Sequence, residues 1–217
     1  MPLPEQHRPD RLGLTPGGIL VVNPRDQTTV KDDLRRHGEV AKDWEWHEQH
    51  QYLHRWMTRF KERMLDPVLR TDRGRMPDPV ISFDRMRREI LAAYTLVRNP
   101  QGLLDEITFN TAHFVDIPDV GRVWEYGEWG LLETALHEQV HLWQEDCGEH
   151  PVTPGKAYHN AEFVARCEAL GLHPRLVAGC HWKPADGLFA ILMREYGIAP
   201  PEAGEVPKDK PRWDWWD

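Results

Sequence analysis

The sequence predicts an α+β fold from two patterns of side chains. Apolar residues recur at helical spacing in four segments, residues 42–65, 131–147, 159–171 and 184–196. Short runs containing β-branched or aromatic residues, which are typical of strands, occupy residues 80–83, 91–98 and 105–110. We therefore expect helices and a small sheet in one domain.

A chain of 217 residues is long enough for one domain with terminal segments. We expect an N-terminal extension at 1–41, the main domain at 42–197, and a tail rich in proline, tryptophan and acidic residues at 198–217. Within the extension, residues 19–22 could add an edge strand and residues 26–37 could form a short helix. The tail is expected to dock on its own domain, on a second copy or on a partner, because exposed tryptophans are costly in water.

The composition predicts a cytoplasmic protein. No apolar run is long enough to span a membrane, and no secretory signal is apparent at the N-terminus. The 3 cysteines form neither a C-x-x-C pair nor a disulfide framework. The sequence gives no indication of the oligomeric state.

Charge is distributed unevenly along the chain. The net charge of −8 argues against a general nucleic-acid binder. Residues 55–98 carry 11 Lys or Arg and 6 Asp or Glu, whereas residues 101–150 carry 1 and 11. Solvated surface explains both runs. The alternative is that the basic part docks an anionic partner such as DNA.

The first expected helix, residues 42–65, carries an aromatic and aliphatic stripe that should face the core. Asp66 and Pro67 should end it. His47, His50 and His54 lie near one side of this helix and are interpreted as surface residues.

The expected strands 91–98 and 105–110 should form a hairpin through residues 99–102, where Asn, Pro and Gly favour a turn. In a peptidase, an edge strand can pair with an extended substrate. Residues 106–110 are the candidate for that strand. Trp124, Tyr126 and Trp129 follow in a Gly- and Pro-containing stretch, where they could wall a cleft or fill the core.

The most informative motif is His137-Glu138-Gln139-Val140-His141, an H-E-x-x-H sequence. Its two histidines are four residues apart, so on a helix both imidazoles can reach one metal ion. Apolar residues of 131–143 fall on one side of such a helix and both histidines on the other, with Gln139 the exception. We expect an amphipathic helix that Gly148 ends in a left-handed conformation.

A catalytic zinc usually has three protein ligands and an open position, so a third ligand is needed. His159 and Glu162 are the candidates, at the start of a second helical pattern that Gly171 closes. If His159 is the ligand, Glu162 could orient an imidazole from outside the metal shell.

The residues around these motifs resemble the SprT-like metallopeptidases, which include Spartan-type DNA–protein crosslink proteases. The likeness lies in Leu136 to Gln144, in His159-Asn160-Ala161-Glu162-Phe163 and in the following Leu170-Gly171, and it extends over residues 46–172. It implies a zincin-like domain in which a small antiparallel sheet packs on the metal-binding helices. It also implies zinc held by His137, His141 and His159, with Glu138 as the catalytic base.

Two departures from the family pattern stand out. Asn160 replaces the usual glycine after the third histidine, and the chain lacks the paired C-x-x-C of the C-terminal zinc ribbon that many members carry. Asn tolerates a left-handed backbone, so the first departure is mild. Tyr158 is a candidate oxyanion donor, and a packed loop tyrosine is the alternative.

These features predict a zinc metalloendopeptidase that hydrolyses a protein or peptide substrate, with DNA association implied only by the resemblance. One alternative is a regulatory protease that cuts a single repressor or partner. Another is a non-catalytic binding module stabilised by zinc. Downstream, His173 and His181 have no partner spacing, and the last helix should bury Leu188, Ile191, Leu192 and Tyr196.

Overall fold

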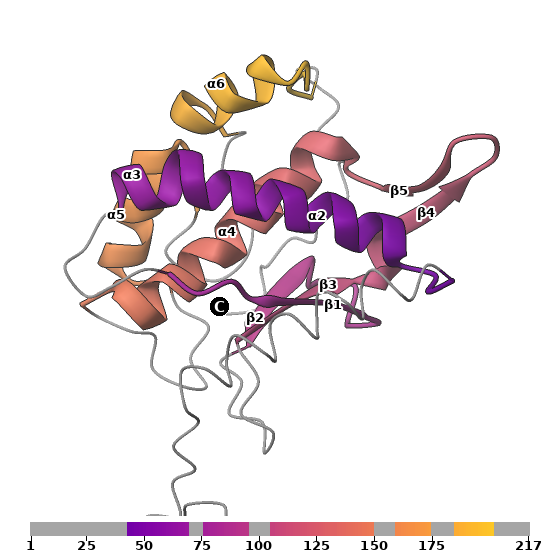
Figure 1. Cartoon of the computed structure of the whole chain (residues 1–217), viewed down its shortest axis with the longest axis horizontal. Helices are drawn as coiled ribbons and strands as arrows, with labels where there is room; N and C mark the ends of the chain where they lie inside the picture. Colours follow the sequence, from indigo (N-terminus) through magenta and orange to yellow (C-terminus); the bar gives the residue numbers. More distant parts are fainter. Residues whose placement is uncertain (1–42, 70–75, 96–104, 150–158, 175–184, 202–217) are drawn as a thin grey trace, which may run out of the picture. The chain divides into compact units, whose positions relative to one another are not determined.

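The computed structural model describes residues 43–69, 76–95, 105–149, 159–174 and 185–201. The chain divides into two compact units, Met1–His47 and Glu48–Asp217. The second unit holds an α+β arrangement of helices and small sheets (Figure 1). The expected N-terminal extension, with its strand and short helix, and nearly all of the expected tail lie outside the described residues.

The first helical stretch begins and ends later than predicted. It consists of α2 (His47–Phe60), a π-helical turn (Lys61–Leu65) and α3 (Asp66–Val68). Its buried residues within α2 are Leu53, Trp56, Met57 and Phe60, which confirms the aromatic stripe as core. Pro67 does not end the helix because it lies in the first turn of α3, where a missing N–H is tolerated.

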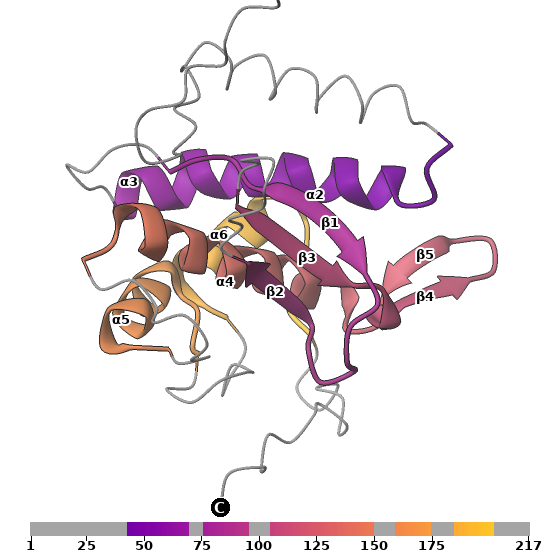
Figure 2. The same cartoon turned by 90° about the horizontal axis from the view of Figure 1, so that it is seen from below.

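A three-stranded sheet has the order β1-β3-β2, with β3 in the centre (Figure 2). It is formed by β1 (Val80–Asp84), β2 (Ala92–Thr95) and β3 (Glu106–Asn110). β2 and β3 pair antiparallel, as the expected hairpin requires. β1 and β3 pair in parallel, so the prediction of an antiparallel sheet is wrong for β1.

Asn110 explains the parallel pairing. Its fully buried side chain accepts a hydrogen bond from the N–H of Met86 and donates to the carbonyl oxygens of Arg87 and Ile90. The turn after β1 is therefore fixed beside the last residue of β3, and the two strands end at the same edge. A hydrophobic pattern does not reveal this side-chain contact.

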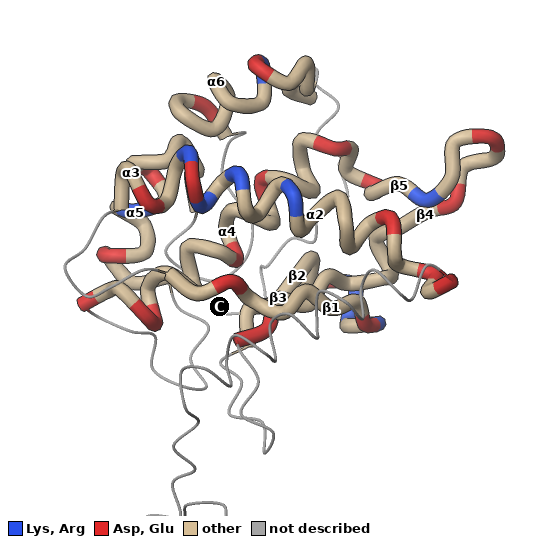
Figure 3. Tube along the Cα trace, viewed as in Figure 1, with Lys and Arg blue, Asp and Glu red and all other residues tan. Residues whose placement is uncertain are grey.

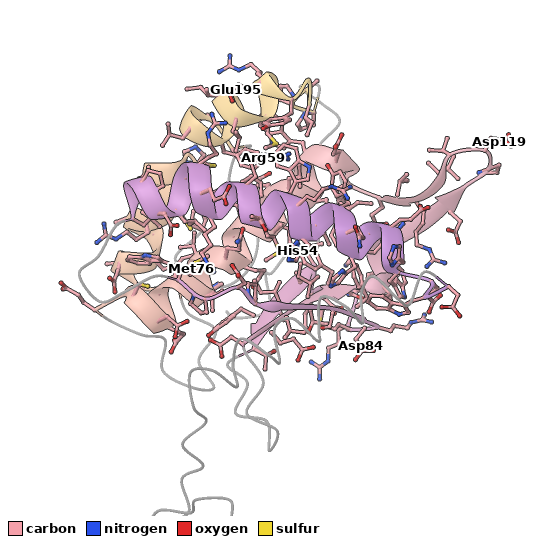
Figure 4. The ribbon with its side chains drawn as sticks, in the orientation of Figure 1. His54, Arg59, Met76, Asp84, Asp119 and Glu195 are labelled. Atoms are coloured by element: carbon pink, nitrogen blue, oxygen red, sulfur yellow. The ribbon has the colours of Figure 1, made fainter. Side chains whose placement is uncertain are left out.

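A second, two-stranded sheet leads into the central helix. After a 3₁₀ turn (Thr111–His113), β4 (Phe114–Ile117) and β5 (Gly121–Trp124) pair antiparallel. Asp119, which has φ 64°, lies at the far end of this hairpin (Figure 4). Trp124 and Trp129 are both buried, so at least two of the aromatic residues in this stretch fill the core.

Helix α4 (Gly127–Cys147) is the central element and packs against β2, β5 and α5. The predicted solvated side is wrong, because polar residues of this helix are buried as well, namely Glu133, His137, Glu138, Gln139 and Gln144. Strand β2 and helix α5 cover the side that carries the histidines. Gln139, on the other side, donates from Nε2 to the Met57 carbonyl oxygen of α2 at 2.9 Å.

Gly148 ends α4 in an extended conformation, with φ −74° and ψ 167°. The left-handed conformation expected there is therefore wrong. The position has no room for a side chain, because a Cβ would lie 2.4 Å from the Gln144 carbonyl oxygen. Glycine is required here by close packing, not by backbone conformation.

Two shorter helices complete the described fold, α5 (Ala161–Leu170) and α6 (Gly187–Glu195). Gly171 ends α5 with φ 92°, as the sequence predicts. The predicted buried side of α6 is largely wrong. Leu188, Ile191 and Tyr196 are exposed, whereas the buried residues are Phe189, Leu192 and Met193.

The contacts of α6 explain this difference. The Phe189 ring lies 5.1 Å from that of Trp129 on α4 and 6.0 Å from that of Phe60 on α2. On the neighbouring side, the Arg59 guanidinium covers the Tyr196 ring at 4.1 Å from the ring centroid. Tyr196 thus packs at the rim of the helix contact. Within the described residues, no helix combines the length and apolarity needed to cross a membrane.

Candidate metal centre

The structure brings His137, His141 and His159 together. One potential ligand atom from each lies within 4.8 Å of the others. His137 and His141 lie one turn apart on α4, and His159 directly precedes Asn160, the N-cap of α5. His159 is 22 positions from His137 and 18 from His141 along the chain, and the three meet because α5 packs against α4.

Phe163 packs against all three imidazole rings. Its fully buried ring stacks on His141 at 4.0 Å and on His159 at 4.4 Å, and meets the edge of His137 at 5.0 Å between centroids. Phe163 thereby restricts how the imidazoles can turn. It is the last residue of the second motif, and nothing in the sequence alone assigns it this role.

The imidazoles are electrostatically suited to binding a metal ion. Burial, together with repulsion from His159, lowers the pKa of His141 to about 3. A neutral imidazole keeps a ring nitrogen lone pair free for a metal, whereas an imidazolium does not. Three imidazoles with no carboxylate among them, two buried and that of His141 half-buried, match the donor set of a catalytic zinc site. The residues present therefore fit zinc.

Glu138 lies between the two α4 histidines in sequence and is 8% exposed. Its Oε2 accepts a hydrogen bond of 2.8 Å from the backbone N–H of Tyr94 in β2. Burial raises the pKa of its carboxyl to about 7, although the Tyr94 hydrogen bond acts in the opposite direction. A carboxyl group with a pKa near neutrality can both take up and release a proton at physiological pH.

Strand β2 is the edge strand next to this site. The prediction that residues 106–110 provide an open edge is wrong, because β3 is paired on both sides. The Tyr94 N–H points away from β3 towards Glu138. By the alternation of an antiparallel ladder, the backbone groups of Ala92 and Tyr94 face away from β3.

The surroundings of Tyr94 are acidic. Its hydroxyl donates to Asp105 Oδ2 at 2.9 Å, and burial followed by that hydrogen bond raises the pKa of the tyrosine. Burial, Asp105 and Glu145 raise the pKa of Asp146 to about 6. Basic residues lie instead along α2 and the π-helical turn that follows it (Figure 3), namely Arg55 and Arg59 in α2 and Lys61 and Arg63 in the turn.

The remaining predicted residues have other positions. Glu162 accepts a hydrogen bond of 3.0 Å from the Glu149 N–H, and it is not part of the three-histidine group. Tyr158 and His181 lie outside the described residues. His173 Nε2 lies 2.9 Å from Asp186 Oδ1, a contact that its sequence spacing does not indicate.

Two functional features were missed from the sequence. The contact between Tyr94 and Glu138 joins residues 44 positions apart and has no local signal. The Asn160 side chain caps α5 by accepting from the Phe163 N–H at 2.9 Å. Asn followed three residues later by the first apolar residue of a helix is a capping pattern, so this second feature was available in the sequence.

Comparisons of the chain with protein-family models, with curated proteins and with solved structures find no match. The likeness to SprT-like metallopeptidases therefore depends on the motif residues themselves.

Proposed function

We propose that this chain is a zinc-dependent metalloendopeptidase with a zincin-like site of the SprT-like type. One observation carries the proposal. The structure places three clustered imidazoles, a buried carboxyl with a pKa of about 7 and an edge strand on one side of α4. Metal-dependent peptide hydrolysis needs a metal site, a group that transfers a proton and a surface that binds an extended chain.

The residues have distinct roles in this proposal. His137, His141 and His159 hold zinc, and Phe163 keeps the imidazoles in place. Zinc bound by three histidines supplies Lewis acidity towards a carbonyl group and makes water more acidic. Glu138 takes the proton from the attacking water and returns it to the leaving nitrogen.

The substrate is proposed to bind as an extended segment along β2. The outward-facing backbone groups of Ala92 and Tyr94 can pair with such a segment. Because the Tyr94 N–H is bonded to Glu138, the proposed partners for the substrate are the Ala92 N–H and the carbonyl oxygens of Ala92 and Tyr94. A protein substrate bound to DNA and a single regulatory partner are both compatible with this surface.

The proposal is tested first by metal content. We expect about one zinc per chain in the purified protein, and its loss in His159→Ala, because two histidines alone bind zinc weakly. His54→Ala is the matched control, since it removes an exposed histidine of α2 (Figure 4). Zinc retained by His159→Ala at the parent level would contradict the three-histidine site.

The catalytic role is tested by Glu138→Gln. We expect full zinc content and a loss of peptidase rate of about a hundredfold or more, because the amide cannot accept and return the proton. An unchanged rate would contradict the base assignment. If neither parent nor variant cleaves any peptide library although both bind zinc, the binding-module alternative is favoured over a protease of broad specificity. Addition of DNA separates a DNA-stimulated protease from a dedicated regulatory one.

A further inference from the structure

Asn160 joins the two helices that carry the metal ligands. Its side-chain Oδ1 accepts a hydrogen bond from the backbone N–H of Phe163 at 2.9 Å and another from Gln144 Nε2 at 2.7 Å. The first bond caps α5, and the second reaches across to α4. Asn160 follows His159 directly in the chain, so both bonds act next to the third ligand.

The hydrogen bond to the Phe163 N–H fixes which atoms of the Asn160 and Gln144 side-chain amides face each other. A backbone N–H can only donate, so the atom of Asn160 that faces Phe163 must be the oxygen. Gln144 must then present its NH₂ group to the same oxygen. Gln144 is fully buried and lies three residues after His141 on the same side of α4. The pair therefore links the helical side that carries His137 and His141 to the residue beside His159.

We propose that Gln144 and Asn160 are positioning residues that hold His159 at the metal site. This inference rests on the proposed three-histidine metal site. In the family that the sequence resembles, glycine is usual at position 160, and glycine has no side chain to accept either bond. In this chain, therefore, Asn160 together with Gln144 fixes the position of His159, which glycine at position 160 could not do.

The proposal predicts different zinc affinities for variants that remove the Gln144 donor, remove the Asn160 oxygen or keep an oxygen at position 160. Gln144→Met removes the donor but leaves the cap on α5, and Asn160→Gly removes both bonds. Both variants are expected to bind zinc about tenfold to a hundredfold more weakly, which is typical for loss of a group that orients a ligand. Asn160→Asp keeps an oxygen facing both donors and is expected to bind zinc within about threefold of the parent.

The experiment measures zinc affinity by competition with a chromophoric chelator, and the melting temperature of the metal-free protein. Gln139→Met is the matched control, because it also removes one buried glutamine hydrogen bond from α4, on the side facing Met57. Both Met variants should lower the melting temperature without metal. Only Gln144→Met should weaken zinc binding.

The outcomes separate this inference from the proposed function. If the parent binds zinc and His159→Ala does not, the site stands. In that case, parent-like affinity in Gln144→Met, or an equal loss in Gln139→Met, overturns the positioning role alone. Asn160→Asp as weak as Asn160→Gly also overturns it. A parent that binds no zinc overturns both proposals.

Discussion

Asp146 shows how partial desolvation and neighbouring carboxylates affect the pH dependence of stability at an exposed residue. Its pKa is raised in the folded chain from the ordinary 3.8 to about 6, by burial and by Asp105 and Glu145. The folded state therefore holds the proton more tightly than the unfolded state. Its contribution to stability is lost as pH rises from about 4 to about 6, and the carboxylate remains unfavourable above that range.

We expect Asp146→Asn to raise the melting temperature at pH 8 by a small amount, because Asp146 is exposed and solvent screens part of the effect. The effect should be much smaller near pH 4, where the aspartate is protonated in the folded state and about half ionised in the unfolded state. Calorimetry of parent and variant between pH 4 and pH 8 measures the difference. Asp119→Asn is the control, because an asparagine accepts its φ of 64° equally well and the residue lies in an exposed turn. A benefit of Asp146→Asn that is as large at pH 4 as at pH 8 would contradict the assigned cause.

The residues of the candidate metal site could be predicted from the sequence. His137, Glu138 and His141 follow from a helical spacing, and the structure brings His159 to them. The environment of Glu138 was not accessible, since its partner Tyr94 comes from a strand. Gly148 shows the same limit, because its need for glycine comes from the Gln144 carbonyl and not from a positive φ.

At the scale of elements, α6 provides a direct test of which helix side is buried. Phe189 is fully buried between Trp129 and Phe60, whereas Ile191 is 48% exposed. We expect Phe189→Ala to reduce the free energy of unfolding by about 3–5 kcal/mol, as for other buried aromatics. Ile191→Ala should change it by about 0.5 kcal/mol or less.

Urea denaturation of both α6 variants measures these free energies. An equal loss of unfolding free energy in the two variants would contradict the burial of Phe189 in preference to Ile191. The sequence pattern failed because Phe189 packs against Phe60 of α2 and Trp129 of α4, and a nine-residue helix leaves room for two apolar stripes. Only the packing partner decides between such stripes.

The sheet shows what a sequence pattern can and cannot give at this scale. All three strands were expected close to where they lie, and the antiparallel pairing of β2 with β3 is confirmed, whereas the predicted turn at residues 99–102 lies outside the described residues. Strand order and the direction of β1 depend on the buried Asn110 side chain and its bonds to the turn after β1. Hydrophobic runs contain no information on such a bond, so the mixed sheet and the central place of β3 were missed.

At the scale of the molecule, the proposed metal should contribute to folding stability. Removing zinc leaves buried polar groups on α4 without the ion that would hold the imidazoles together. Binding to the folded state alone stabilises by about 2.7 kcal/mol when free zinc is a hundredfold above the dissociation constant. We expect chelation to lower the melting temperature and added zinc to restore it.

Scanning calorimetry with and without chelator measures this shift, and His159→Ala should show no shift. A parent protein that melts at the same temperature in both conditions would contradict a resident zinc. The α+β class was predicted correctly at this scale. The burial of the polar side of α4 was not predicted, because it depends on packing against β2 and α5, which the sequence of the helix does not reveal.

The hydrogen bond from Tyr94 to Glu138 has a consequence for how this protein can vary. The donor is a main-chain amide, so the bond survives any substitution at position 94 that keeps the strand, with proline the exception. The side chain at that position, which lies beside His141 and Asp105, is free to change while the carboxyl stays anchored. In the proposed peptidase, mutation at this position can therefore change substrate preference while the backbone hydrogen bond to Glu138 remains.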